Sequence, residues 1–323
     1  MGVAALIFRV MSIVAHKDYS QMDRALRFLS DYGPDLSNGF TNHAPMVSEA
    51  LSAMGRADAV MPWLQQNWPL RGLMMKREAP SHPIADWKAA LGNGASFDWA
   101  AFLFDDLKAS GWQSFVARWT ARLAPGACSD AAHGIIRAGH AVRSMQEDQT
   151  PERLREIADA FGMWAAGYTT LPAADYAGTP MRAREAIAQV PFSPGKAREN
   201  RGGFTTGLKS LDDFPGFAPV IGMLDVEGDA GEILSELTEM FTRVYLANAH
   251  DPYTVIAFIH GVTALSALRR LAAYLDAETT RAGLRYGWQT AAALYSVYGT
   301  AKPDWRPAAA LSSDILSAAT LSE

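Results

Sequence analysis

Four of the seven histidines in this 323-residue chain are placed where helices could bring them to one metal ion. They are His43, His133, His250 and His260. Neutral imidazole is the commonest metal ligand that proteins offer, and it suits iron, copper, nickel and zinc. A metal site is therefore the first hypothesis, and the histidines alone do not choose among these metals.

The local sequence around three of them allows an ordinary interpretation as well. His43 falls in the first turn of a predicted helix, where the helix dipole favours a neutral imidazole; a surface histidine near a helix cap is the alternative. His260 lies in the apolar run VIAFIHGVT, so we expect it to be buried and either hydrogen-bonded or metal-bound. His250 ends a predicted helix, where the dipole by itself favours histidine.

His133 belongs to a polar stripe in the segment SDAAHGIIRAGHAVRS. On a helix, His133, Arg137 and His140 share one face, at spacings of four and seven residues. If that face points inward, each group needs a partner, because an unsatisfied buried polar group costs roughly 1–3 kcal/mol. The stripe therefore indicates either a metal ligand beside a polar pocket wall or a solvated helix face.

The elements that must position these residues are helices. Apolar residues recur with the periodicity of a helix, and glycines or prolines follow where each helix should end. This pattern predicts helices over 21–29, 42–55, 97–108 and 112–123, helices that start at 129 or 130 and at 151, and helices over 230–249, 252–275 and 277–298. Few segments alternate with the period of a strand, so we predict an all-α fold in one large domain. Six prolines interrupt 171–228, which we expect to be an irregular lid, binding loop or linker.

Composition and missing motifs exclude several functions. A net charge of −5 without a basic cluster argues against nucleic-acid binding. The single cysteine, Cys128, excludes an intrachain disulfide and thiolate metal clusters. The chain has no pair of Glu-x-x-His motifs and none of the metalloprotease, hydrolase or dinucleotide-binding motifs. The apolar stretch 1–15 is too short to span a bilayer, and we expect a cytoplasmic protein without a membrane partner.

Several segments together resemble the questin oxidase-like family. They are NHAPMVSEALSAMGR at 42–56, HGIIRAGHAVRS at 133–144 and FIHGVTALSALRRL at 258–271, and WAAGYTTLP at 164–172 looks like the bacterial branch of that family. The segments occur in the family's order and at roughly its intervals.

The resemblance implies an all-helical oxygenase that uses O2 and one non-haem iron(II) to act on a polycyclic aromatic polyketide. In fungi such enzymes open the central quinone ring of anthraquinones. The family's iron is held by four histidines and an N-carboxylated lysine. His43, His133 and His260 match the family's segments, His250 is the fourth candidate, and Lys302 is the candidate for the carbamate.

Further roles follow from this assignment. Arg137 and His140 are candidates to orient or deprotonate a substrate phenol. Asn42, Asp251 and Thr263 are candidates to fix the orientation of the ligating imidazoles. Two other functions remain open: a Baeyer–Villiger-type oxidase with external NADPH and no bound iron, or a helical binding protein for hydrophobic aromatics. A homo-oligomer is compatible with the sequence.

Overall fold

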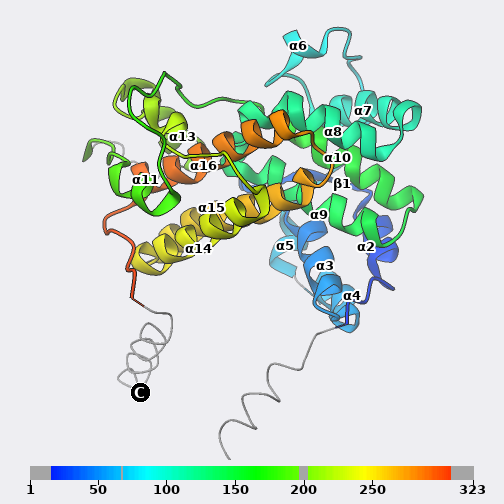
Figure 1. The fold of residues 1–323 in the computed structure, drawn as a ribbon. Helices are drawn as coiled ribbons and strands as arrows, with labels where there is room; N and C mark the ends of the chain where they lie inside the picture. The colour runs from blue at the N-terminus through cyan, green and yellow to red at the C-terminus, as the bar shows by residue number, and fades with distance from the viewer. Residues whose placement is uncertain (1–15, 67, 196–202, 307–323) are drawn as a thin grey trace, which may run out of the picture. The chain divides into compact units, whose positions relative to one another are not determined.

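A computed structural model of the chain describes residues 16–66, 68–195 and 203–306. The predicted all-α fold is confirmed: 66% of the chain is helical, and the described part contains only two short strands (Figure 1). Within this fold the chain divides into two compact units. Unit 1 comprises Met1–Thr170 and Ser266–Gly287, and unit 2 comprises Leu171–Leu265 and Trp288–Glu323.

Unit 1 is built around a group of antiparallel helices. Its elements are α2 (Met22–Leu29), β1 (Tyr32–Leu36), α3 (Ala44–Ala53), α4 (Ala57–Gln66), α5 (Trp68–Leu73), β2 (Met74–Lys76), α6 (Trp87–Ala90), α7 (Ser96–Ser110), α8 (Trp112–Leu123), η1 (Ala124–Gly126), η2 (Ser129–Ala132), α9 (His133–Glu147) and α10 (Pro151–Ala166). Helices α7 and α9 pack on α10, and α3 packs on α9. The strands form an antiparallel pair with Tyr32 opposite Lys76. The contact between α3 and α9 brings the first two candidate histidines together.

Unit 2 contains α11 (Ala183–Gln189), α13 (Phe204–Lys209), η3 (Ser210–Asp213), η4 (Ala218–Gly222) and α14 (Ala230–Asn248), and the long helices α15 (Pro252–Ala272) and α16 (Ala277–Tyr298) contribute to both units. The segment predicted to be irregular thus carries several short helices. It is tied to the long helices: the Trp288 indole donates to the Val220 carbonyl at 2.7 Å, and Glu236 accepts from the Ala183 amide at 3.1 Å.

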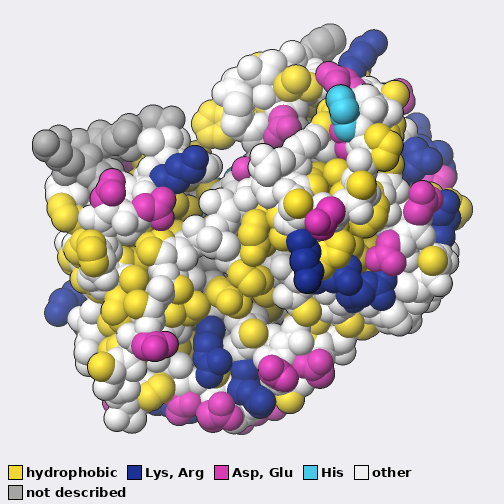
Figure 2. All heavy atoms as spheres, turned by 90° about the horizontal axis from the view of Figure 1, so that it is seen from above, with side chains coloured by type: hydrophobic (Ala, Val, Ile, Leu, Met, Phe, Trp, Pro, Cys, Tyr) yellow, Lys and Arg dark blue, Asp and Glu magenta, His cyan; other side chains and the backbone are white. Residues whose placement is uncertain are grey.

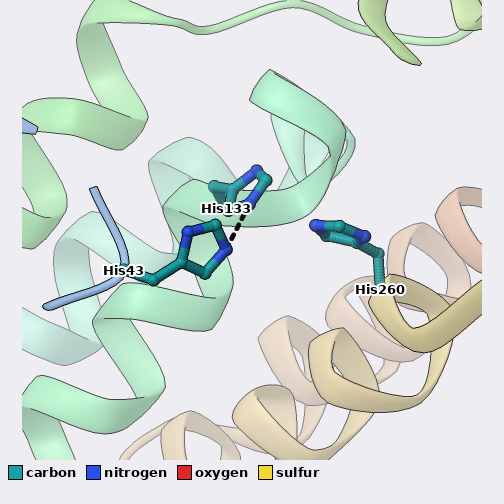
Figure 3. A group of neighbouring side chains, drawn as sticks. All are labelled: His43, His133 and His260. Atoms are coloured by element: carbon teal, nitrogen blue, oxygen red, sulfur yellow. Dashed lines mark hydrogen bonds between the residues drawn. The ribbon is translucent and has the colours of Figure 1, made fainter. Parts of the chain in front are cut away.

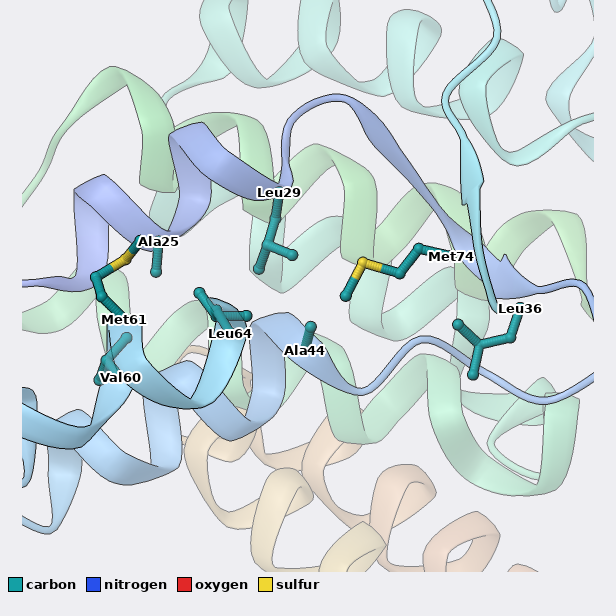
Figure 4. Close-up of a cluster of buried hydrophobic side chains, with 8 residues drawn as sticks. All are labelled: Ala25, Leu29, Leu36, Ala44, Val60, Met61, Leu64 and Met74. Atoms are coloured by element: carbon teal, nitrogen blue, oxygen red, sulfur yellow. The ribbon is translucent and has the colours of Figure 1, made fainter. Parts of the chain in front are cut away.

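A cluster of buried apolar side chains fixes the beginning of α3 (Figure 4). It joins α2, α3, α4 and the two strands through Ala25, Leu29, Leu36, Ala44, Val60, Met61, Leu64 and Met74. Burying a side chain of leucine size contributes roughly 1.5–3 kcal/mol. Because Ala44 follows His43 directly and is fully buried, the cluster also fixes the position of the His43 backbone at the start of α3.

The surface carries charges of both signs. On the face drawn in Figure 2, Lys and Arg side chains lie among Asp and Glu side chains, in keeping with the lack of a basic cluster in the sequence. Among the described residues, α15 alone is long and apolar enough to cross a membrane, and half of its most apolar stretch is buried within the protein. A buried core helix has the same properties.

Helix α9 approaches its neighbours closely at two glycines. A Cβ atom added to Gly134 would lie 2.6 Å from Cγ of Trp164 on α10, and one added to Gly139 would lie 2.5 Å from Cβ of Ala267 on α15. Both separations are shorter than van der Waals contact, so only glycine lets the helices pack at this distance.

The Gly139→Ala substitution should therefore lower the free energy of unfolding by about 1–3 kcal/mol, the usual cost of overpacking a core. Urea unfolding followed by circular dichroism measures this change. Gly72→Ala is the matched control, because a Cβ atom there meets nothing within 4 Å. Equal stability of the two variants would contradict the close approach of α9 and α15.

Candidate metal centre

His43 occupies the residue before α3, and main-chain atoms orient it. The Asn42 side chain accepts from the Ala44 amide at 3.1 Å and donates to the Gly33 carbonyl at 3.1 Å, which fixes the turn that leads into the helix. The Nδ1 atom of His43 lies 2.8 Å from the Thr41 carbonyl oxygen. Asn42 was predicted to orient this imidazole directly; it acts on the backbone instead, and the Thr41 carbonyl holds the ring.

His133 follows a rare backbone conformation. Asp130, Ala131 and Ala132 have φ values of 48°, 55° and 74°, in the left-handed region. The predicted helix start at Ser129 or Asp130 is therefore wrong, and α9 begins at His133. The left-handed turn of residues 130–132 places the Asp130 carbonyl oxygen 2.5 Å from Nδ1 of the buried His133. The left-handed turn thus holds this imidazole as Thr41 holds His43.

Relieving this backbone strain should stabilise the protein. A non-glycine residue in the left-handed region costs roughly 1–2 kcal/mol, so Ala131→Gly should raise the free energy of unfolding by about 0.5–1 kcal/mol after the added entropy of the unfolded chain is subtracted. Thermal or urea unfolding of the metal-free protein measures the change. The control, Ala138→Gly in the middle of α9, should lose about 1 kcal/mol. A loss of stability in Ala131→Gly would argue against the left-handed turn.

His260 lies in the middle of α15 and is buried, as its apolar neighbours predicted. Its Nδ1 atom is hydrogen-bonded to the Ile256 carbonyl oxygen, one turn earlier in the helix. The Phe204 ring of α13 packs beside it, with ring centroids 5.9 Å apart. A third imidazole is therefore held by the main chain through Nδ1.

These contacts determine where the imidazole protons lie. A carbonyl oxygen only accepts hydrogen bonds, so each Nδ1 carries a hydrogen. In the neutral ring each Nε2 is then unprotonated and bears a lone pair. The Nε2 atoms of His43 and His133 nevertheless lie 3.0 Å apart (Figure 3). Two lone pairs at that distance repel each other unless a proton or a cation lies between them. The pair is thus built to accept a positively charged species.

His43 and His133 both belong to unit 1, whereas His260 belongs to unit 2. Metal–nitrogen bonds of about 2 Å separate two ligating nitrogens by at most about 4 Å, so the 3.0 Å between the Nε2 atoms of His43 and His133 lets both bind one ion after small side-chain movements. Neutral imidazoles fit a divalent transition metal.

Desolvation favours the ligating form of His43. Its side chain is exposed overall, but neighbouring protein atoms desolvate the ring, and this lowers the pKa of His43 against the opposing hydrogen bond to Thr41. Protonation of His140 would lower the pKa of His43 further. A neutral imidazole has the lone pair that a metal needs.

The other two predicted ligands, His250 and Lys302, are exposed residues of unit 2. His250 is exposed in the turn between α14 and α15, where its amide donates to the Thr254 hydroxyl at 3.0 Å. Lys302 is exposed beyond α16, next to Ala301, whose amide is held by Asn248 at 2.8 Å. Lys302 therefore lacks the burial that carbamate formation requires.

Two residues predicted to orient the imidazoles have local roles in α15. The carboxylate of Asp251 accepts from the amides of Tyr253 and Thr254, at 2.9 and 3.0 Å, at the start of the helix. The Thr263 hydroxyl donates to the Ile259 carbonyl at 2.9 Å. The three imidazoles instead bond to carbonyl groups, which no side-chain pattern in the sequence could reveal.

The two predicted catalytic residues each have an acidic partner that we did not foresee. Arg137 is buried and donates to Glu156 through Nε and Nη2 at 2.7 and 2.9 Å, so its guanidinium is committed to a structural ion pair. Nδ1 of His140 lies 2.6 Å from Oε2 of Glu49. Both glutamates are buried. The sequence contains one sign of these two ion pairs: each glutamate is an acidic residue on the mainly apolar face of its helix.

No family model and no curated protein matches this chain. The chemistry of the site therefore rests on the residues themselves.

Proposed function

We propose that His43, His133 and His260 bind one divalent metal ion and that the protein is a non-haem iron(II)-dependent oxygenase. Its proposed substrate is a polycyclic aromatic phenol of the anthraquinone type, in which a ring C–C bond is cleaved. The facing lone pairs of His43 and His133, 3.0 Å apart, support metal binding. The choice of iron, of oxygen and of substrate class depends on the resemblance of the sequence to the questin oxidase-like family.

The protein's own residues would prepare this chemistry. The carbonyl groups of Thr41, Asp130 and Ile256 hold the Nδ1–H groups, which leaves Nε2 as the ligating atom of each ring and orients the ring. When bound, iron(II) would supply the electrons that let O2 react with an electron-rich ring. His140, near His43, would orient the substrate hydroxyl.

The test is anaerobic loading with Fe(II), followed by metal analysis and by oxygen uptake with a panel of anthraquinols. We expect about one iron per chain and oxygen uptake that requires both iron and an anthraquinol. Folded protein that binds neither Fe(II) nor Zn(II) would refute the metal site and leave a binding protein for aromatics. Oxidation of a quinone or ketone that needs NADPH but no metal would support the Baeyer–Villiger alternative.

A further inference from the structure

Glu49 of α3 is a buried carboxylate surrounded by hydrogen-bond donors. Only 1% of the residue is exposed. The Tyr19 hydroxyl donates to its Oε1 at 2.5 Å, Nε of Arg143 donates to Oε1 at 2.6 Å, and Nη2 of Arg143 donates to Oε2. Burial alone would raise the pKa of Glu49, but the hydrogen bonds from His140 and Arg143 lower it to about 2. Glu49 is therefore ionised at neutral pH.

This carboxylate determines the tautomer of His140. Oε2 of Glu49 lies 2.6 Å from Nδ1 of His140 and can only accept, so the hydrogen is on Nδ1. In the neutral ring, Nε2 then carries the lone pair, and no hydrogen bond joins it to any residue that the structure describes. The His140 side chain remains 24% exposed. A carboxylate that fixes a histidine through Nδ1, with Nε2 free, is the arrangement of a general base.

The pair lies on the same two helices as the first two candidate metal ligands. His140 follows His133 by two turns of α9, about 10 Å along the helix axis at 1.5 Å per residue. Glu49 lies on α3, which begins directly after His43. A proton gained by His140 would act electrostatically on His43, so these two rings lie within electrostatic range. A flat molecule of several fused rings spans about this separation.

We infer that Glu49 and His140 form a proton-accepting dyad that selects substrates with an acidic aromatic hydroxyl. This inference rests on the proposed function and adds a chemical requirement to the substrate. The hydroxyl O–H bond breaks, the proton forms a bond with Nε2 of His140, and the electron pair stays on the phenolate oxygen. No electrons are transferred. The Glu49 carboxylate stabilises the resulting imidazolium, and Arg143 and Tyr19 keep Glu49 in place.

The test uses 2-hydroxyanthraquinone, whose absorption moves to longer wavelength when its hydroxyl ionises. The protein is loaded with Zn(II), which has no redox chemistry, at a pH where the free probe is protonated. We expect the wild-type protein to bind the probe in its ionised form. His140→Gln and Glu49→Gln should each lower the ionised fraction of bound probe by about tenfold or more while zinc stays stoichiometric.

Two outcomes separate failure of this inference from failure of the metal site. Wild-type protein that takes up no zinc would refute the proposed function. Stoichiometric zinc with an undiminished spectral shift in His140→Gln would refute the dyad and assign the ionisation to the metal. Asp159→Asn, which breaks the half-buried ion pair with Arg77 in the same unit, is the control for destabilisation and should keep both zinc and the shift.

A second measurement does not require the variants to fold. Histidine 15N spectra of the wild-type protein should show that the neutral form of His140 has its hydrogen on Nδ1. A neutral ring with its hydrogen on Nε2 would overturn the dyad, because that atom could then not accept a proton.

Discussion

Replacing His133 with alanine should abolish stoichiometric metal binding and leave the helical fold in place. The substitution removes one of the two paired imidazoles of unit 1 and takes from His43 its partner at 3.0 Å. Residues that merely orient a ligand are worth roughly 10- to 100-fold in affinity, so removal of a ligand should weaken binding by more than about 100-fold. Anaerobic titration with Fe(II) or Zn(II), with metal analysis after gel filtration, measures the loss.

His250→Ala is the matched control for this experiment. His250 is exposed, so its removal should change the metal affinity by less than about twofold, in line with a neutral surface substitution. Unchanged affinity in His133→Ala would disprove the metal centre. A large loss of metal affinity in His250→Ala would identify His250 as the fourth ligand that the sequence predicted.

Replacing Arg137 with methionine should be the most destabilising single change in α9. It leaves the Glu156 carboxylate buried without its guanidinium partner, and breaking a buried pair on one side costs about 3–5 kcal/mol. Burial already raises the pKa of Glu156, against the opposing effect of Arg137. In the folded variant Glu156 would bind a proton more tightly than in the unfolded chain, so stability should fall as the pH rises above the unfolded pKa near 4.3.

The double variant tests whether the pair is structural. Arg137→Met combined with Glu156→Leu removes both charges, and should recover most of the lost free energy and remove the added pH dependence. Urea unfolding between acidic and neutral pH measures both effects. If the double variant is as unstable as Arg137→Met alone, the ion pair is not the source of the loss. If it also keeps the proposed oxygenase activity in full, Arg137 has no role in that reaction.

The long helices could be predicted from the sequence because their pattern is local. The apolar period of 3.6 residues and the flanking Asp-Pro and Gly signals placed α14, α15 and α16 to within a few residues. The two strands were not predicted, since YGPDL and MMK are too short to alternate. Nor could alanine at Ala131 and Ala132 indicate a left-handed turn, because alanine has no preference for that conformation.

The site could be predicted only in part, for a related reason. The apolar run around His260 predicted its burial correctly. The partner of His140, Glu49, is 91 residues away in the chain, and only the packing of α3 on α9 joins them. His250 was predicted as the fourth ligand from the same stretch of sequence as His260. Its position depends on a turn that leaves it in solvent, which residue type does not encode.

The atoms that hold the three imidazoles belong to the peptide backbone, at Thr41, Asp130 and Ile256. Point mutations at these positions change the side chain but leave the carbonyl acceptor in place. The position of each acceptor can therefore change only if the main chain moves. Because these acceptors are uncharged, the rings bring no negative charge to a bound ion. A divalent ion would retain its full double charge toward whatever anion approaches it, which would make a phenolate a better partner than a neutral phenol.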